Sequence, residues 1–215
     1  MKYGLIHYNI SGSIEEVVRW AAEAGFDAIE VSWKDVWPAD EAEPEKRAEA
    51  LRKVMDEVGL EASALATGND FVVLDTDEIV AQVERMKRMG RLAKILGTNV
   101  FRTEGGRPKD EVPPERHVEA MAGCLERCLE FAEEDDLYFA VDNHGTVTND
   151  ADLQVELFKR VGSKRVVWGS DTPVLMKDQA DYLSNDLERV RALCITDDEK
   201  ADLLGNSIAA LLRQP

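Results

Sequence analysis

The stretch LYFAVDNHGTVTND, residues 137–150, holds the side chains of the chain best suited to acid–base or metal chemistry. Its apolar first half ends abruptly in the tetrapeptide Asp-Asn-His-Gly at residues 142–145. Side chains alternate along an extended chain, so Asp142 and His144 point to the same side. A carboxylate and an imidazole placed in this way could transfer a proton or bind a cation together.

Four other predicted strands have the same design, with a polar group near the carboxyl end. The predicted strands are residues 3–9, 28–33, 61–67, 99–105, 138–144 and 165–171, with residues 192–196 as a weaker seventh. Alternation places an apolar face on each strand opposite a face that turns polar. Besides Asp142 and His144, the polar sets contain His7 and Asn9, Glu30 and Ser32, Arg102 and Glu104, and Asp171. Five converging sets favour a functional site over solvated strand ends.

Amphipathic helical segments separate these strands. Ser13 with Glu16, and Thr196 with Glu199, have the spacing of the capping box that begins a helix. Glycines follow the helical runs, as they do at helix C-termini, at positions 25, 59, 97 and 162. Alternating strands and helices predict a parallel sheet in one α/β domain spanning residues 1–215, whose polar strand ends gather on one side.

Three acidic residues, Glu104, Asp142 and Asp171, are the candidate metal ligands. If their strands are neighbours about 4.8 Å apart, the carboxylates converge and repel one another unless a cation or a proton intervenes. Carboxylates with one imidazole suit Mn²⁺, Mg²⁺ or Zn²⁺. Separate salt bridges to Arg102, Arg107 and Lys34 are the alternative explanation of the same residues.

Three segments of the sequence resemble the xylose isomerase-like TIM-barrel superfamily, which contains sugar phosphate isomerases and epimerases. They are AAEAGFDAIEVSW (21–33), VFRTEGGRP (100–108) and FAVDNHGTVTNDADLQVELFKRVGS (139–163). The resemblance implies that Asp142 replaces a metal-binding Glu, and that Asp171 in Asp-Thr-Pro matches a second ligand. The family's later His and Glu ligands have no counterpart. The resemblance therefore implies an α/β, TIM-barrel-like repeat with parallel strands, shortened to six or seven strands.

A resemblance of this kind implies a divalent-metal-dependent sugar or sugar phosphate isomerase or epimerase acting through an enediolate. A carboxylate, Glu104 or Asp142, would move the proton, and His144 or His7 would act as the second acid or base. The residues expected to contact the substrate are Asn9, Glu30, Ser32, Trp33 and Arg102.

Two other functions remain open. Residues 165–174 and 195–212 are similar to the end of amidohydrolase-like metal-dependent hydrolases, which implies a hydrolase or decarboxylase with Asp171 as the base. A shortened barrel could also act without catalysis and form a dimer that covers its open strand edges.

Composition narrows the class of partner. The net charge of −17 and the sequence pI of about 4.6 argue against nucleic acid or an anionic membrane as the partner. A small-molecule sugar or related hydroxy-carbonyl partner is what the family resemblance implies. No apolar run approaches the length of about 20 residues that spans a bilayer. Three cysteines without a Cys-x-x-Cys pair predict a reducing, cytoplasmic setting.

Overall fold

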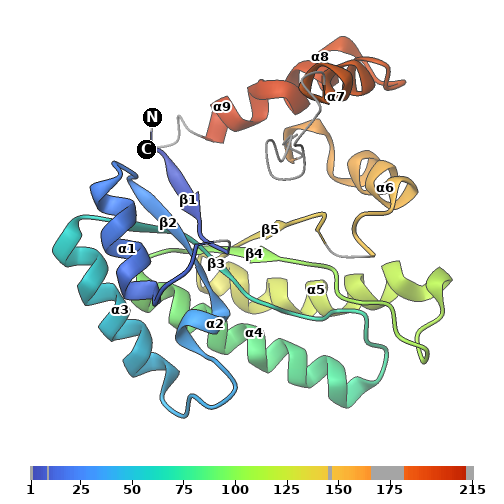
Figure 1. Cartoon of the computed structure of the whole chain (residues 1–215). Helices are drawn as coiled ribbons and strands as arrows, with labels where there is room; N and C mark the ends of the chain where they lie inside the picture. Colours follow the sequence, from blue (N-terminus) through green and yellow to red (C-terminus); the bar gives the residue numbers. More distant parts are fainter. Residues whose placement is uncertain (1, 9, 145–146, 166–181, 212–215) are drawn as a thin grey trace. The chain divides into compact units, whose positions relative to one another are not determined.

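The computed structural model describes residues 2–8, 10–144, 147–165 and 182–211 (Figure 1). The chain separates into two compact units, Met1–Asp150 and Ala151–Pro215. Each unit is described by itself below.

The first unit is built on a parallel sheet whose strands follow one another in sequence order. The strands are β1 (Gly4–Ile6), β2 (Ala28–Ser32), β3 (Glu61–Ala66), β4 (Val100–Thr103) and β5 (Tyr138–Val141). The first five predicted strands are thus confirmed, and so is the parallel α/β architecture. In the described residues the sheet stays open and does not close into a barrel.

Helices cover one face of this sheet. They are α1 (Ile14–Glu23), the short α2 (Trp33–Val36), α3 (Pro44–Val58), α4 (Thr76–Leu96), the 3₁₀ turn η1 (Pro114–Arg116) and α5 (His117–Glu134). Figure 1 shows α1, α3, α4 and α5 on the same side of the strands. The core lies between the two layers, where Ile29, Leu65 and Phe101 are fully buried. Phe101 meets Phe139 edge-on, with ring centroids 5.1 Å apart. Glu30 and Arg102 alternate with Ile29 and Phe101 along their strands and therefore lie on the opposite face of the sheet.

The predicted helix ends are confirmed. At the start of α1, Glu16 N donates to Ser13 Oγ at 3.3 Å, and Ser13 N donates to Glu16 Oε2 at 2.8 Å. Thr196 and Glu199 form the same capping box before α8 (Asp197–Ala201). The glycines at 25, 59, 97 and 162 all have the positive φ that ends a helix.

The second unit is helical in its described part. It contains α6 (Ala151–Val161), the 3₁₀ turn η2 (Ser163–Arg165), α7 (Tyr182–Arg191), α8, the π-helical turn η3 (Asp202–Asn206) and α9 (Ser207–Leu211). Ser163 Oγ donates to Asp202 Oδ2 at 2.6 Å, and Ser207 Oγ donates to the Ser163 carbonyl at 3.1 Å. These two bonds connect η2 to the C-terminal helices.

The prediction of a weak strand at residues 192–196 is wrong. These residues form the turn between α7 and α8, because Thr196 is the N-cap of α8 and therefore belongs to a helix start. Leu193 is also exposed, so the segment lacks the buried face of a strand. Of the predicted sixth strand, residues 166–171 lie outside the described residues.

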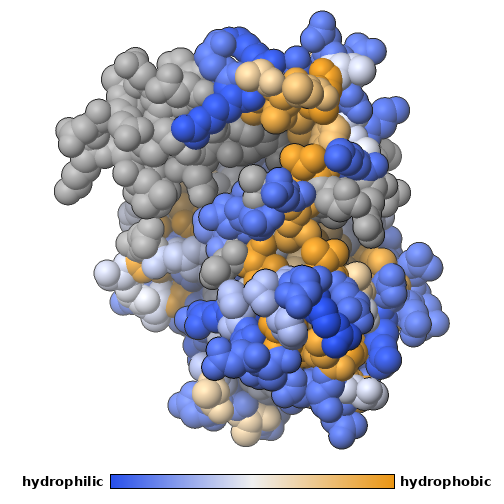
Figure 2. Space-filling view, turned by 90° about the vertical axis from the view of Figure 1, so that its right-hand side faces the viewer, coloured by the Kyte–Doolittle hydropathy of each residue, from blue (hydrophilic) through white to orange (hydrophobic). Residues whose placement is uncertain are grey.

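The face drawn in Figure 2 has many hydrophilic side chains, in keeping with a chain in which 32% of the residues are charged, and apolar side chains are also visible between them. The described helices include none that is long and apolar enough to cross a membrane. All three cysteines are free, and only Cys194 is exposed. Burial raises the pKa of Cys124 to about 11 and that of Cys128 to about 12, so both thiols stay protonated at neutral pH.

Candidate functional site

A guanidinium group lies at the centre of the polar strand ends. Arg102 of β4 donates through Nε to both carboxylate oxygens of Glu30 on β2, at 3.0 and 2.9 Å. Its Nη1 donates to Asp142 Oδ2, just beyond β5, at 2.7 Å and lies 3.7 Å from Glu104 Oε1. We call Glu30, Arg102, Glu104, Asp142, His144 and Tyr8 the Arg102 cluster.

The strand register explains how Arg102 reaches Glu30 across an intervening strand. Arg102 is the sheet neighbour of Ala66 on β3, and Glu30 is the neighbour of Ala64 on the same strand. Both alanines are buried and end in a methyl group. The long arginine side chain can therefore lie over β3 and reach two strands away, a span of about 10 Å. A larger residue at position 64 or 66 would occupy this path.

Charge pairing sets the protonation states in the cluster. Burial lowers the pKa of Arg102, but Glu30, Tyr8 and Asp142 outweigh it and raise that pKa above its ordinary value. Burial raises the pKa of Asp142, whereas hydrogen bonds with His144 and Arg102 have the larger combined effect and lower it. Asp142 is therefore ionised at neutral pH. The repulsion expected among the carboxylates is relieved here by the guanidinium group.

Two aromatic side chains complete the cluster. His144 Nδ1 lies 2.9 Å from Asp142 Oδ1, and 55% of the His144 side chain is exposed. Tyr8 donates its hydroxyl hydrogen to Glu30 Oε1 at 2.7 Å, and its oxygen contacts Arg102 Nη2. Burial, followed by the hydrogen bond with Glu30, raises the pKa of Tyr8. The phenol therefore remains protonated and available as a donor.

Sequence reasoning missed Tyr8 because the register of β1 was unknown. Ile6 is the sheet neighbour of Glu30, so the face that carries Glu30 continues through Ile6 towards Tyr8. The prediction placed His7 and Asn9 on this face. That placement of His7 is corrected by the register. The only signal in the sequence was the alternation itself, which cannot tell one face of a short edge strand from the other.

Of the predicted site residues, the structure brings together Glu30, Arg102, Glu104, Asp142 and His144. His7, Ser32 and Trp33 have other contacts, and Asn9 and Asp171 lie outside the described residues. Ser32 is used to begin α2: Lys34 N donates to its hydroxyl at 3.3 Å, and its own N donates to Asp35 Oδ2 at 2.8 Å.

His7 pairs with the same carboxylate that begins α2. Its Nε2 lies 3.1 Å from Asp35 Oδ2, and 8% of the residue is exposed. The hydrogen bond with Asp35 raises the pKa of His7, although burial opposes this. His7 Nδ1 is buried and has no hydrogen-bond partner among the described residues.

We expect His7 to make stability depend on pH near neutrality. Its pKa is raised in the folded protein, so its stabilising contribution is complete below the unfolded value of 6.5 and is lost as pH rises through the folded value. The difference in unfolding free energy between the wild type and His7→Gln, measured by urea titration, should therefore shrink above pH 6.5. Asp35→Asn should remove the same dependence. A difference that stays constant or grows with rising pH would contradict the ion pair.

A glycine beneath Trp33 fixes the position of the indole. Gly68 has a φ of +57°, and a Cβ added there would lie 2.0 Å from Trp33 Nε1. Any larger residue would push the indole away from the strand ends.

We expect Gly68→Ala to lower the unfolding free energy by about 3 kcal/mol or more, because overpacking adds to the cost of a left-handed backbone. Gly59→Ala is the matched control, since Gly59 has a φ of +72° and open space around its Cβ position. It should cost only the backbone share, about 1–2 kcal/mol. Equal losses for the two variants in urea unfolding would show that Trp33 does not pack on Gly68.

The donors of the cluster are of the types that hold a divalent metal. Asp142 and Glu104 supply carboxylates beside one nitrogen of Arg102, and His144 supplies an imidazole. Among the described residues, no group of three or more His, Cys, Asp or Glu side chains is arranged to hold a metal ion. Both oxygens of Asp142 already have partners. The donor types fit a metal, and Asp142 would exchange one of its present partners to bind it.

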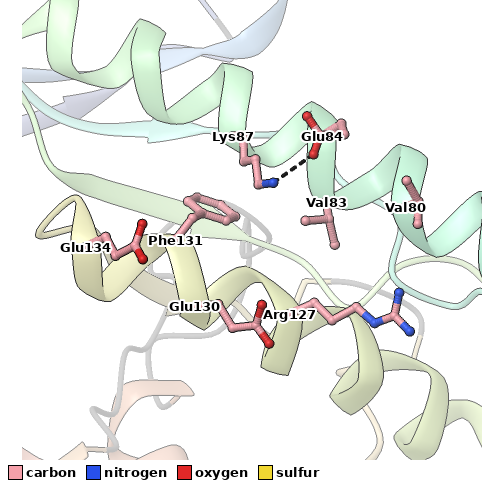
Figure 3. Close-up of a pocket in the computed structure, with 8 residues that line it drawn as sticks. All are labelled: Val80, Val83, Glu84, Lys87, Arg127, Glu130, Phe131 and Glu134. Carbon is pink, nitrogen blue, oxygen red and sulfur yellow. Dashed lines mark hydrogen bonds and ion pairs between the residues drawn. The ribbon is translucent and has the colours of Figure 1, made fainter.

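A cavity of about 560 Å³ lies away from these strand ends, between α4 and α5 (Figure 3). Val80, Val83 and Phe131 form its apolar part, and charged side chains such as Lys87, Glu84 and Arg127 surround them. Lys87 Nζ donates to Glu84 Oε1 at 2.8 Å. The cavity is a groove between two outer helices and contains no residue of the Arg102 cluster.

Solved structures with a similar fold include several sugar epimerases. The IOLI protein, solved with a zinc atom, has a TM-score of 0.61 and 16% identity, with 93% of this chain and 70% of that chain covered. D-psicose 3-epimerase from Clostridium cellulolyticum H10, solved with D-tagatose, has a TM-score of 0.59 and 13% identity, with 74% and 60% covered. The probable 3-DHS dehydratase AsbF from Bacillus anthracis has a TM-score of 0.57 and 20% identity, with 75% and 59% covered.

The TM-scores show a common fold, and at these low identities they show the fold alone. The chain spans about 60% of the length of the last two proteins. No curated protein matches the sequence. The family model described as xylose isomerase-like TIM barrel matches residues 18–203, which includes residues 165–174 and part of residues 195–212, the two segments that resemble amidohydrolase-like enzymes. With strand order, polar strand ends and family match in agreement, the chain belongs to the xylose isomerase-like TIM-barrel family.

Proposed function

We propose that this protein is a divalent-metal-dependent isomerase or epimerase of a sugar, a sugar phosphate or a related hydroxy-carbonyl compound. The observation that carries the proposal is the position of Asp142 and His144 at the end of β5, beside Arg102 and Glu104. Substrates of this family of folds are bound where the carboxyl ends of the strands meet. The epimerases among the structural neighbours agree with this class of reaction.

Asp142, with Asp171 and Glu104, would hold the metal. The bound ion would supply polarisation of the substrate carbonyl. Glu104 is 3.7 Å from Arg102, and 46% of its side chain is exposed, so it is the carboxylate best placed to take a proton from a substrate carbon. His144, which is also exposed, would act as the second acid–base group and return a proton to the substrate.

Glu30, Arg102 and Tyr8 are assigned to binding and charge stabilisation. Arg102 would donate to the oxygen on which negative charge develops in the enediolate, while Glu30 keeps the guanidinium oriented. Tyr8, whose hydroxyl donates to Glu30 and whose oxygen contacts Arg102, would help to hold both of these groups in place. His7 is held by Asp35, and we assign the second acid–base role to His144 instead.

We further propose that the protein works as a homodimer in the cytoplasm. Ile6 on β1 and Tyr138 on β5 are 59% and 58% exposed, and both edge strands lack a further partner in the described sheet. Such edges favour association with a second copy. The free cysteines support a reducing compartment. Light scattering of the purified chain would give the oligomeric state, and a monomer at all concentrations would exclude the dimer.

Solvent exchange tests the proposed reaction. The protein is incubated in D₂O with Mn²⁺ and a panel of aldoses, ketoses and their phosphates, and the products are followed by NMR. We expect deuterium at the carbon next to the carbonyl of at least one substrate, together with its isomer or epimer. Asp142→Asn should lose this exchange, and Asp135→Asn, in an exposed pair with Lys94, should keep it. Release of acid or CO₂ without exchange would instead support a hydrolase or decarboxylase.

A further inference from the structure

An arginine outside the Arg102 cluster is held between two indole rings. The Cζ atom of Arg85, on α4, lies 4.9 Å from the ring centroid of Trp33 and 5.1 Å from that of Trp37. Trp33 is the first residue of α2, and Trp37 directly follows its last residue. The contacts therefore join α2 to α4, which lie next to each other in Figure 1. Indole faces attract a guanidinium group through the negative charge of the ring face. These contacts explain why the side chain is ordered, but they leave its hydrogen-bond donors unused.

Arg85 differs from its neighbour Arg88 in having no carboxylate partner in the described structure. Arg88 also stacks on Trp37, at 4.6 Å, and makes two hydrogen bonds of 2.9 Å to Glu45. Arg85 Nη2 makes one long hydrogen bond, 3.4 Å, to the Thr67 carbonyl. A guanidinium group has five N–H donors. Four of them therefore have no acceptor among the described residues.

Partial burial of the Arg85 guanidinium group lowers the stability of the folded protein when no anion pairs with it. Arg85 is half-buried, and desolvation is the cause that lowers its pKa, with no charged partner to raise it. A buried cation without a counter-charge is destabilising. The whole chain carries 43 acidic and 26 basic residues, so a cation left without a carboxylate is unexpected on charge grounds. A ligand anion would supply the missing partner.

The position of Arg85 connects it with the ends of the strands. Thr67, whose carbonyl accepts from Arg85, directly follows β3, and its N donates to the Arg102 carbonyl at 3.1 Å. Trp33 directly follows β2. Contacts with ring faces do not use N–H donors, so the donors that do not bond to Thr67 remain for a ligand. A pair of such donors matches a carboxylate or phosphate through two parallel hydrogen bonds.

We infer that Arg85, clamped by Trp33 and Trp37, is an anion-binding residue that takes a carboxylate or phosphate group of a small-molecule ligand at the ends of β2 and β3. Identifying this ligand as the substrate rests on the proposed function. In that case the substrate is an acidic sugar or a sugar phosphate rather than a neutral sugar. The anion site itself does not depend on which reaction the protein catalyses.

Binding of simple anions to the full chain tests the inference without turnover. Inorganic phosphate and acetate are titrated separately at constant ionic strength, and tryptophan fluorescence is recorded, because two indoles contact Arg85. We expect a saturable change with phosphate, acetate or both, and the stronger binder identifies the group. Arg85→Gln should bind the preferred anion at least about tenfold more weakly. Arg85→Lys should also bind more weakly, since it keeps the charge and loses the paired donors.

Arg88→Gln is the matched control, because Arg88 lies on the same helix and the same indole but is neutralised by Glu45. It should retain anion binding. No saturable change in the wild type, or equal binding by Arg85→Gln, would overturn the inference. Anion binding without solvent exchange on any sugar would support the anion site and reject the isomerase. Exchange on neutral sugars without anion binding would support the isomerase and reject the anion site.

Discussion

Replacing Arg102 with methionine is expected to lower the free energy of unfolding by about 3–5 kcal/mol, because it leaves a buried carboxylate without its counter-charge. Glu30 is 6% exposed, and Arg102 supplies two of its hydrogen bonds. The Tyr8 hydroxyl alone would remain as a donor. Methionine keeps much of the length and apolar volume of the arginine stem, so the loss reports mainly the missing charge. Urea unfolding at neutral pH measures it.

Two control variants separate this charge effect from simple loss of packing. Arg116→Met removes an arginine whose pair with Glu119 is exposed, so it should cost far less stability than Arg102→Met. The double variant Glu30→Met with Arg102→Met removes both charges and should recover most of the lost stability, since buried pairs are often replaceable by apolar residues. An Arg102→Met variant no less stable than Arg116→Met would refute the central position of Arg102.

Replacing Asp142 with asparagine is expected to abolish both metal retention and catalysis while the fold persists. Asparagine has the same shape but lacks the charge that binds a divalent ion, so we expect metal affinity to fall at least about a hundredfold. Loss of a group that moves protons or holds the substrate costs a further factor of about 10²–10⁴ in rate. Isothermal titration with Mn²⁺ and the deuterium-exchange assay measure these two losses.

The same variant should also change acid stability. The pKa of Asp142 is lowered in the folded protein, so its contribution is present above the unfolded value of 3.8 and is lost as pH falls through the folded value. Asp142→Asn should therefore be closest in stability to the wild type in acid. Asp135→Asn, in an exposed pair, should keep metal binding and exchange. Retained metal or exchange in Asp142→Asn would remove Asp142 from the proposed site.

Local sequence signals predicted the framework well. Ser13 and Glu16 form the capping box that their spacing indicated, and Gly59 and Gly97 have the left-handed backbone expected after a helix. The five described strands also match predicted segments. Each of these features depends on residues close together in the sequence, which is why periodicity and capping were sufficient.

The contacts within the site depended on information that the sequence does not contain. Arg102 was predicted to bind substrate, yet it also pairs with Glu30, 72 positions away, because Ala64 and Ala66 leave a path across β3. Tyr8, and not the predicted His7, lies on the same face as Glu30, because the pairing between β1 and β2 determines the face of each residue. A shift of one residue in register exchanges the two faces. Convergence of Glu104 and Asp142 was predicted, with Arg102 as one alternative partner of these carboxylates, but the pairing of the same guanidinium group with Glu30 was not.

Metal binding by the purified chain tests the central claim most directly. The protein is stripped with a chelator, dialysed against Mn²⁺, Mg²⁺ or Zn²⁺, and analysed for bound metal beside Asp142→Ala and Asp171→Ala. The account predicts stoichiometric retention of at least one of these ions by the wild type and its loss in both variants. A wild type that retains no more of any of the three ions than Asp142→Ala would contradict it.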